Sequence, residues 1–124
     1  IQHWLFDLGG DVCIPDFNLV QSVSIEFLEN DIDRMNEALP MLKDFILPAG
    51  TLVCSFAHQA RVVCRRAERS VMSVHHRDQN IQAASLQLLN RLSDWLFVAS
   101  RTLQRAEGGS EILWQKNIND SIEK

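Results

Sequence analysis

Three arginines spaced four residues apart form the most distinctive polar pattern of the sequence: Arg61, Arg65 and Arg69. In an α-helix these side chains fall at about 0°, 40° and 80° around the axis. Glu68 and His58 fall in or beside the same sector, so five polar side chains share one stripe. Guanidinium groups one turn apart repel each other, which favours a site where an anion or a carboxylate neutralises them.

Two interpretations of this stripe remain open. In the first, the stripe is a solvated basic face that Glu68 and acidic residues of a neighbouring helix partly neutralise. In the second, the stripe binds a polyphosphate or another anionic ligand, because the planar fork of arginine can bond two phosphate oxygens at once. Arg66, at about 140°, points away from the stripe in either case.

A second polar cluster is predicted on a later helix, in residues 90–94 (NRLSD). Asn90 and Asp94 are one turn apart, and the spacing of Asp94 and Arg101 predicts that these two also lie together. Asn and Asp disfavour helix interiors, because their side chains compete for backbone groups. The cluster therefore indicates either a buried polar network between helices or a contact with a ligand.

Other kinds of site find little support in the sequence. His58, His75 and His76 lack the spacing of a metal-binding helix, and we predict no metal site. Gly9-Gly10 is an isolated glycine pair and does not form a phosphate-binding loop motif. No serine, histidine and aspartate or cysteine and histidine arrangement predicts a nucleophilic triad.

The composition indicates one globular domain, because the chain has 124 residues, of which 46% are hydrophobic and 23% charged. The net charge of −4 argues against binding to nucleic acid or to an anionic membrane surface. No apolar run approaches the ~20 residues of a membrane span. Cys13, Cys54 and Cys64 are odd in number and form no CxxC pair, which predicts reduced thiols in a cytoplasmic protein.

Helices must position these residues, since tyrosine is absent and no long stretch alternates apolar and polar residues. We expect helices over residues 1–8, ended by Gly9-Gly10, over residues 18–39, from a cap at Thr51 to residues 75–78, and over residues 79–105. A short helical turn is expected at residues 41–45. Because the first segment has the character of a helix interior, we also expect a further segment upstream.

Helical periodicity predicts which positions are buried. In the second helix they are Ile25, Leu28, Ile32, Met35 and Leu39. In the third they are Leu52, Phe56, Ala60, Val63, Ala67, Val71 and Val74, and in the fourth Ile81, Leu88, Leu92, Trp95, Leu96, Ala99 and Leu103. We predict an all-α, up-down helical bundle of four to five helices over residues 1–105, followed by a poorly ordered tail over residues 106–124.

Four collinear blocks of the sequence carry a family resemblance. They are residues 1–10 (IQHWLFDLGG), 45–50 (FILPAG), 61–69 (RVVCRRAER) and 89–97 (LNRLSDWLF). Together they resemble the PduO-type ATP:cob(I)alamin adenosyltransferases, and RRAER with NRLSD is the most specific part. The N-terminal phosphate-binding segment of that family, rich in Thr, Gly and Asp, has no counterpart in this sequence.

The resemblance implies a cobalamin adenosyltransferase-like bundle that assembles as a homotrimer, with ATP bound between adjacent subunits. It implies transfer of the 5′-deoxyadenosyl group of ATP to the cobalt of reduced corrinoid, with Mg²⁺ accompanying ATP and triphosphate released. Cob(I)alamin is the nucleophile in this reaction, so the protein need not supply one. A cobalamin-dependent enzyme is the expected acceptor of the product.

The resemblance also implies roles for individual residues, beginning with ATP binding. The family's nucleotide-binding positions fall on Arg65, Glu68, Arg69 and Asn90. The two arginines would face the polyphosphate, and Glu68 would orient an arginine or contact magnesium or ribose. Asn90 would contact the nucleoside or order the site.

Catalytic roles are implied for Arg61, Arg65 and Phe45. Arg61 matches an arginine that pairs with an acidic residue across the subunit interface. Phe45 matches an aromatic residue beside the lower face of cobalt, where it excludes an axial ligand. His58 matches a recurring histidine to which we assign no role. The alternatives are a non-catalytic ATP- or corrinoid-binding chaperone or sensor of the same fold, and a structural helical interaction module.

Overall fold

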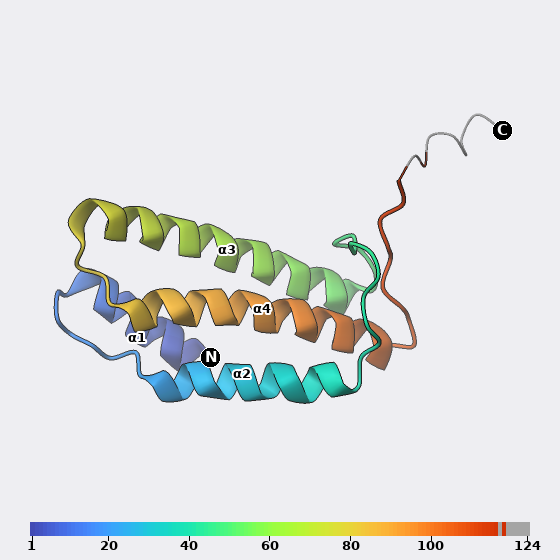
Figure 1. Ribbon diagram of the computed structural model, residues 1–124, viewed down its shortest axis with the longest axis horizontal. Coiled ribbons are helices and arrows are strands. Elements are labelled where there is room, and N and C mark those ends of the chain that lie inside the picture. The colour runs from blue at the N-terminus through green and yellow to red at the C-terminus, as the bar shows by residue number, and fades with distance from the viewer. Residues whose placement is uncertain (117, 119–124) are drawn as a thin grey trace.

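The computed structural model of the chain describes residues 1–116 and residue 118. The described residues form four helices: α1 (Gln2–Cys13), α2 (Ser22–Glu37), α3 (Leu52–Asp78) and α4 (Ala83–Ala106). Consecutive helices run in alternating directions, and α4 lies between α2 and α3 (Figure 1). The prediction of an all-α, up-down bundle with four helices is confirmed.

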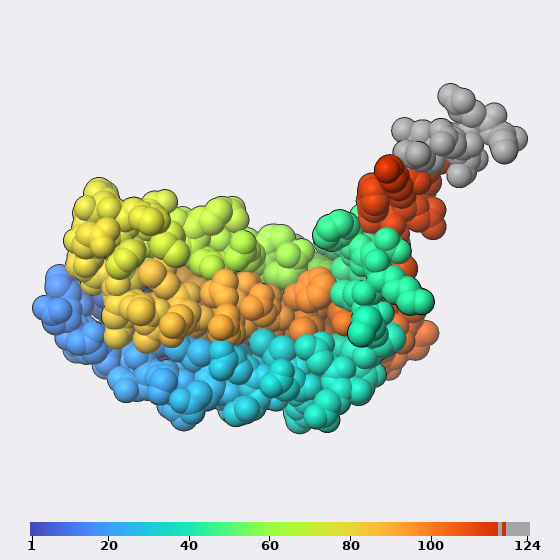
Figure 2. Space-filling model, viewed as in Figure 1, coloured from blue at the N-terminus to red at the C-terminus, as the bar shows by residue number. Residues whose placement is uncertain are grey.

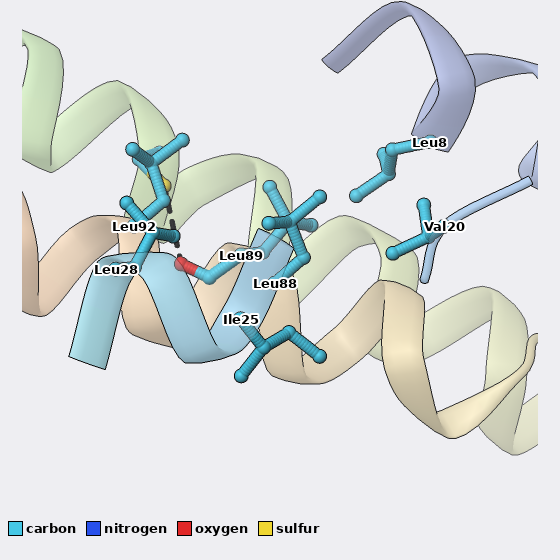
Figure 3. Close-up of a cluster of buried hydrophobic side chains, with 8 residues drawn as sticks. Leu8, Val20, Ile25, Leu28, Leu88, Leu89 and Leu92 are labelled. Carbon is cyan, nitrogen blue, oxygen red and sulfur yellow. Dashed lines mark hydrogen bonds between the residues drawn. The ribbon is translucent and has the colours of Figure 1, made fainter. Parts of the chain in front are cut away.

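The core lies where α4 meets the other helices, and Leu28, Leu88 and Leu89 are its most deeply buried leucines (Figure 3). Its buried members are Leu8, Val20, Ile25, Leu28, Cys64, Leu88, Leu89 and Leu92. The thiol of Cys64 donates a hydrogen bond to the carbonyl of Leu89 at 3.3 Å, which links α3 to α4. Burial raises the pKa of the Cys64 thiol to about 11, so the group is a packing residue and not a reactive thiolate.

The predicted seams of α2 and α4 are confirmed. In α2, Ile25 and Leu28 are buried, and Ile32 and the positions that follow it in the seam are half-buried. The apolar positions predicted for the fourth helix are all buried or half-buried, although Ile81 precedes the first residue of α4. The helix begins at Ala83 instead of Gln79, because Gln79 takes the left-handed conformation (φ 55°, ψ 24°) that ends α3.

The first helix does not end at Gly9-Gly10, as predicted, but continues to Cys13. A Cβ atom on Gly10 would lie 3.2 Å from Cδ1 of Leu19 and 3.3 Å from Cδ1 of Phe17. Glycine at this position therefore lets the following loop pack closely on α1. The cost of glycine inside a helix, about 1 kcal/mol relative to alanine, is small enough for this packing to offset.

Asp11 fastens the loop after α1 to the start of α4. Its carboxylate accepts hydrogen bonds from the backbone amides of Leu19 (2.6 Å) and Val20 (2.9 Å). The side chains of Gln82 and Ser85 donate to the same carboxylate. Burial alone would raise the pKa of Asp11, but these hydrogen bonds outweigh it and hold the pKa below its usual value.

The predicted buried side of α3 is wrong at its first four positions, since Leu52, Phe56, Ala60 and Val63 are exposed, whereas Ala67, Val71 and Val74 are half-buried. Leu52 and Phe56 are 71% and 63% exposed, and the fully buried residues of α3 are Cys54, His58 and Cys64. The side that faces α4 is rotated from the apolar stripe by about a third of a turn. Small and polar side chains therefore face α4, and part of the apolar stripe of α3 lies on the surface.

Two segments without helix meet at one end of the bundle. They are the Phe45 loop (residues 38–51), between α2 and α3, and the C-terminal segment (residues 107–116), which follows α4 (Figures 1 and 2). No helical turn forms at residues 41–45, contrary to the prediction. Instead, Ile46 and Leu113 form an isolated antiparallel bridge, and the amide of Leu47 donates to the carbonyl of Ile112 at 2.8 Å.

The expectation of a poorly ordered tail is therefore wrong for residues 110–114, which pair with the Phe45 loop. Residues 117 and 119–124, the rest of that expected tail, lie outside the described residues. The division of the chain into a domain over residues 1–105 and a tail over residues 106–124 stays a prediction.

Candidate functional site

Glu68 of α3 lies at the centre of a polar network between α3 and α4. One of its carboxylate oxygens accepts a hydrogen bond from Nη1 of Arg65 at 2.5 Å, and the other accepts one from Nδ2 of Asn90 at 3.0 Å. The Glu68 side chain is 13% exposed, whereas that of Arg65 is 46% exposed. The structure thus brings three predicted site residues together and leaves much of the Arg65 guanidinium open to solvent.

The network continues from Asn90 to α2. Nη1 of Arg91 donates to Oδ1 of Asn90 at 2.7 Å, and Nε of Arg91 donates to Oε1 of Glu29 at 2.6 Å. Asn90 and Arg91 thus link α4 to α3 and α2, as the polar-network alternative for residues 90–94 expects, although Asp94 is exposed and the network is only partly buried; a contact with a ligand stays a prediction. Sequence reasoning missed Glu29, because it lies 62 positions from Arg91 and no local pattern connects the two.

Arg61 lies one turn before Arg65 and packs against α4. Its guanidinium carbon is 5.9 Å from the centroid of the Phe97 ring, within the range of a cation–π contact. Its Nε is buried and makes no hydrogen bond with any described residue. His58, almost fully buried, also has a ring nitrogen, Nδ1, without such a partner. Burial and the charge of Arg61 lower the pKa of His58, which keeps the imidazole neutral near pH 7.

Arg69 is exposed, and its guanidinium makes no hydrogen bond or ion pair within residues 1–116. Of the three stripe arginines, only Arg65 has a carboxylate partner in the described part of the chain. Glu68, on the same helix, neutralises one arginine of the stripe, as the solvated-face interpretation expects, whereas no acidic residue of a neighbouring helix pairs with the stripe in the described part of the chain. The stripe presents Arg65 and Arg69 to solvent as cationic groups that can bind an anion, so both interpretations stay open.

Phe45 lies apart from this network. Its side chain is 80% exposed, and its backbone carbonyl accepts a hydrogen bond from the amide of Trp114 at 2.7 Å. At 1.5 Å per residue, Arg65 lies roughly 20 Å along α3 from the helix start at Leu52, where the Phe45 loop ends. The structure therefore does not bring Phe45 into contact with the arginine stripe.

The predicted proximity of Asp94 and Arg101 is wrong. Nε of Arg101 donates to Oε1 of Glu111 at 2.8 Å, and its Nη2 donates to the carbonyl of Pro40 at 2.6 Å. The Phe45 loop and the C-terminal segment thus supply acceptors that bury Arg101, while Asp94 stays exposed, 3.9 Å from Arg91. Nothing in the local sequence pairs Arg101 with Glu111, because residues 110–114 carry no periodic pattern.

A groove of about 450 Å³ runs between α2 and α4 beside the network. Its polar lining includes Glu29, Asp33, Arg91 and Asp94, and Phe97 contributes to its wall. Three carboxylates against one guanidinium make this groove a poor place for a triphosphate. An anionic ligand therefore fits the Arg65 and Arg69 side of α3 better.

Within residues 1–116 and 118, no group of three or more His, Cys, Asp or Glu side chains is arranged to hold a metal ion. None of the helices in this part of the chain combines the length and the apolar character needed to cross a membrane.

Comparisons with known proteins agree with this geometry. A sequence model of the cobalamin adenosyltransferase family matches residues 1–103. The chain is 47% identical over 116 residues to a cobalamin adenosyltransferase of Cupriavidus metallidurans and 40% identical over 121 residues to a corrinoid adenosyltransferase of Bacillus subtilis. Each match covers 94% of this chain and 62% of the relative, so the chain spans about three fifths of the length of these curated proteins.

Solved structures give the same assignment. An arginine variant of a PduO-type ATP:corrinoid adenosyltransferase from Lactobacillus reuteri, complexed with ATP, superposes with a TM-score of 0.86 at 36% identity, over 92% of this chain and 66% of that one. A phenylalanine variant of the PduO-type enzyme of that organism, complexed with cobalamin and ATP, superposes with a TM-score of 0.83 at 33% identity, over 93% of this chain and 66% of that one. Since sequence and fold agree over nearly all of its length, the chain belongs to the cobalamin adenosyltransferase family.

Proposed function

We propose that the protein transfers the 5′-deoxyadenosyl group of ATP to the cobalt of reduced corrinoid, making adenosylcobalamin. The two electrons of cob(I)alamin form the bond to the 5′ carbon, and the bond from that carbon to the triphosphate oxygen breaks. The observation that carries the proposal is the Arg65–Glu68–Asn90 network in a chain of this family. The protein has two tasks in this reaction: aligning the 5′ carbon with cobalt, and stabilising the charge that builds on the leaving triphosphate.

Arg65 and Arg69 fit the second task. Both lie on one side of α3, and both are exposed there. Glu68 holds Arg65 through one nitrogen at 2.5 Å, so the remaining N–H groups of that guanidinium are oriented before a ligand arrives. Each charge-assisted hydrogen bond to a phosphate oxygen contributes about 1.5–3 kcal/mol.

Asn90 and Mg²⁺ complete the proposed nucleotide site. The amide of Asn90 is bonded on both sides, to Glu68 and to Arg91, which fits an ordering role or a contact with the nucleoside. Mg²⁺ would arrive on the triphosphate, since divalent magnesium binds phosphate oxygens and water readily. Glu68 already accepts a hydrogen bond from Arg65. A contact of magnesium or ribose with Glu68 would therefore have to share this carboxylate with Arg65.

Phe45 is the residue we place at cobalt. Its exposed ring can cover an apolar face of the corrinoid and keep an axial ligand away. In the Lactobacillus reuteri enzyme, the phenylalanine and the arginine changed in the two solved variants are twenty residues apart, as are Phe45 and Arg65 in this sequence. This shared spacing supports the assignment of both residues to the reaction.

A homotrimer with ATP between subunits fits two features of α3. The apolar side chains of Leu52 and Phe56 are exposed in the single chain, and contact with a second subunit would bury them. Nε of Arg61 is buried and makes no hydrogen bond within the described residues, which fits an acidic partner on another subunit. We further propose a cytoplasmic location and a cobalamin-dependent enzyme as acceptor of the product.

An adenosyl-transfer assay on the full-length protein tests the proposed function. ATP, Mg²⁺ and chemically reduced cobalamin are mixed with the protein, and the absorbance change to adenosylcobalamin is followed. We expect Arg65→Ala to lower the rate by tenfold or more, because one charge-assisted bond to the leaving group is lost. Arg66→Ala is the matched control, since Arg66 is exposed on another side of the same helix and should keep the wild-type rate.

Each other result of this assay contradicts a different part of the proposal. ATP binding without transfer would replace the enzyme by a chaperone or sensor of the same fold. If the protein neither bound ATP nor transferred the adenosyl group, only the structural helical module would remain as an interpretation. Transfer that Arg65→Ala does not slow would overturn the site assignment while leaving the reaction in place.

A further inference from the structure

We propose that the buried ion pair of Arg101 and Glu111 positions Phe45. Within the described residues, the side chains of Arg101 and Glu111 make no hydrogen bond to Phe45 or to an arginine of the stripe, so both are positioning residues. The inference rests on the proposed function, in which Phe45 lies against the corrinoid. It adds the C-terminal segment and the end of α4 to the parts of the chain on which that function depends.

One guanidinium binds both segments that meet at this end of the bundle. Nε of Arg101 donates to the carboxylate of Glu111, in the C-terminal segment, at 2.8 Å. Its Nη2 donates to the carbonyl of Pro40, in the Phe45 loop, at 2.6 Å. The side chains of Arg101 and Glu111 are only 6% and 7% exposed, so water does not compete effectively for these bonds.

Glu111 belongs to the C-terminal segment, whose backbone is paired with the backbone around Phe45. Three residues after it, the amide of Trp114 donates to the carbonyl of Phe45 at 2.7 Å, and Leu113 forms the bridge to Ile46. The side chain of Phe45 is mostly exposed, so packing contributes little to its position. The backbone fixes the Cα–Cβ bond of Phe45, and thus the region that its ring can reach, and that backbone is paired with the segment that Glu111 anchors.

Gln104 makes a parallel connection one turn further along α4. Its Oε1 accepts a hydrogen bond from the amide of Thr51 at 2.9 Å, and its Nε2 donates to the carbonyl of Ser110 at 3.1 Å. Gly50, with φ at +133°, lies directly against this amide group and leaves no room for a Cβ atom. The end of α4 thus binds both segments through Arg101 and through Gln104, and Arg105 adds a further bond to the C-terminal segment, where its Nη2 donates to Oε2 of Glu111 at 2.5 Å.

Close packing completes the arrangement. Between the Phe45 loop and the two helices below it, a cavity of about 10 Å³ remains, lined among others by Leu47, His58 and Arg101. This is space for about one water molecule. The loop covers the end of α4 in Figure 2, so its backbone has little freedom while the ion pair is intact.

Arg101→Lys in the full-length protein tests the inference. Lysine keeps the charge, but its single ammonium group cannot reproduce the two directed bonds of the planar guanidinium. We expect kcat with reduced cobalamin to fall tenfold or more, KM for ATP to stay within twofold, and the amides of Leu47 and Trp114 to exchange hydrogen at least tenfold faster. Arg77→Lys, at the exposed far end of α3, is the matched control and should change none of these.

A double-mutant cycle separates positioning from a general loss of structure. If Arg101 acts through Phe45, then Arg101→Lys should have little further effect on kcat in a Phe45→Ala background. Additive effects would overturn the inference, as would amides of Leu47 and Trp114 that stay protected in Arg101→Lys. No transfer by the wild-type protein would overturn the proposed function and the role at cobalt with it, whereas the exchange rates would still report whether Arg101 holds the loop.

Discussion

The arginine stripe of α3 and the Phe45 loop differ in how their side chains are held. Arg65 is bonded to Glu68 three positions away on the same helix, and Asn90 meets them from the helix packed alongside. Phe45 is held through its backbone by Trp114, from a segment near the end of the described chain. One chain thus places the proposed anion site on rigid helices and the aromatic residue on a loop that only long-range contacts order.

The largest expected effects come from changing one residue in each region. Phe45→Ala should lower kcat for adenosyl transfer by about 100-fold with KM for ATP nearly unchanged, because we place the residue at cobalt.

Arg69→Ala should raise KM for ATP by about tenfold or more, because the proposed bond to the polyphosphate, of about 1.5–3 kcal/mol, would be lost. Steady-state kinetics with each substrate varied in turn measure both parameters.

Phe6→Ala is the control for the phenylalanine change, since Phe6 is 84% exposed on α1, outside both regions. The contrast between the regions would be broken if Phe45→Ala weakened ATP binding as strongly as Arg69→Ala does. In that case the two regions would form one site, and the separation along α3 would not describe the protein with its substrates bound.

Local spacing accounts for what the sequence predicts correctly here. The i, i+3 relation of Arg65 and Glu68 and the seam of α2 follow from 3.6 residues per turn, and the cap at Thr51 follows from its hydroxyl. Asn90 is indicated both by its unusual place inside a helix and by the family resemblance, and the structure brings it to Glu68.

The remaining features depend on contacts between distant parts of the chain. Glu29 joins the network from α2, and the C-terminal segment pairs with residues 45–47, directly after the residues 41–45 where a helical turn was expected. The buried side of α3 was wrong for another reason: an apolar stripe can face a helix of its own chain or a second chain. Periodicity detects the stripe around Leu52 and Phe56 but not which partner covers it.

The carboxylate of Glu111, which pairs with Arg101 beside the Phe45 loop, should give the next largest effect, and this effect depends on pH. Burial alone would raise the pKa of Glu111, but hydrogen bonds from Arg105 and Arg101 and the charge of Arg101 lower it from 4.5 to about 2. A carboxyl group whose pKa is lowered by folding stabilises the folded state above its unfolded pKa. This contribution is therefore complete above about pH 4.5 and is lost as the pH falls toward 2.

Glu111→Gln should accordingly destabilise the protein by about 1–2 kcal/mol near neutral pH, since the amide keeps some hydrogen bonds but not the charge. Chemical unfolding of the wild-type and variant proteins between pH 7 and pH 2.5 measures the difference, which should shrink below about pH 4.5. Glu107→Gln, an exposed position near the end of α4, serves as control. A difference that stays constant down to pH 2.5 would show that the charge of Glu111 does not contribute.

The smallest expected effect lies at the junction of the two regions. Thr51 ends the Phe45 loop and begins α3: its hydroxyl accepts a hydrogen bond from the amide of Cys54 at 3.2 Å, and its own amide donates to Gln104. Thr51→Ala removes the cap and should cost about 1 kcal/mol, whereas Thr51→Ser should restore most of it. Equilibrium unfolding measures both changes.

Hydrogen exchange then shows whether the two regions respond together. The backbone bond from residue 51 to Gln104 survives in Thr51→Ala, so the amide of Cys54 should exchange faster while that of Leu47 stays protected. If both amides lost protection equally, the helix cap and the loop would open as one cooperative unit. The Phe45 loop would then depend on the first turn of α3 as much as on Arg101 and Glu111, and the division between a helix-borne site and a loop-borne site would fail at this residue.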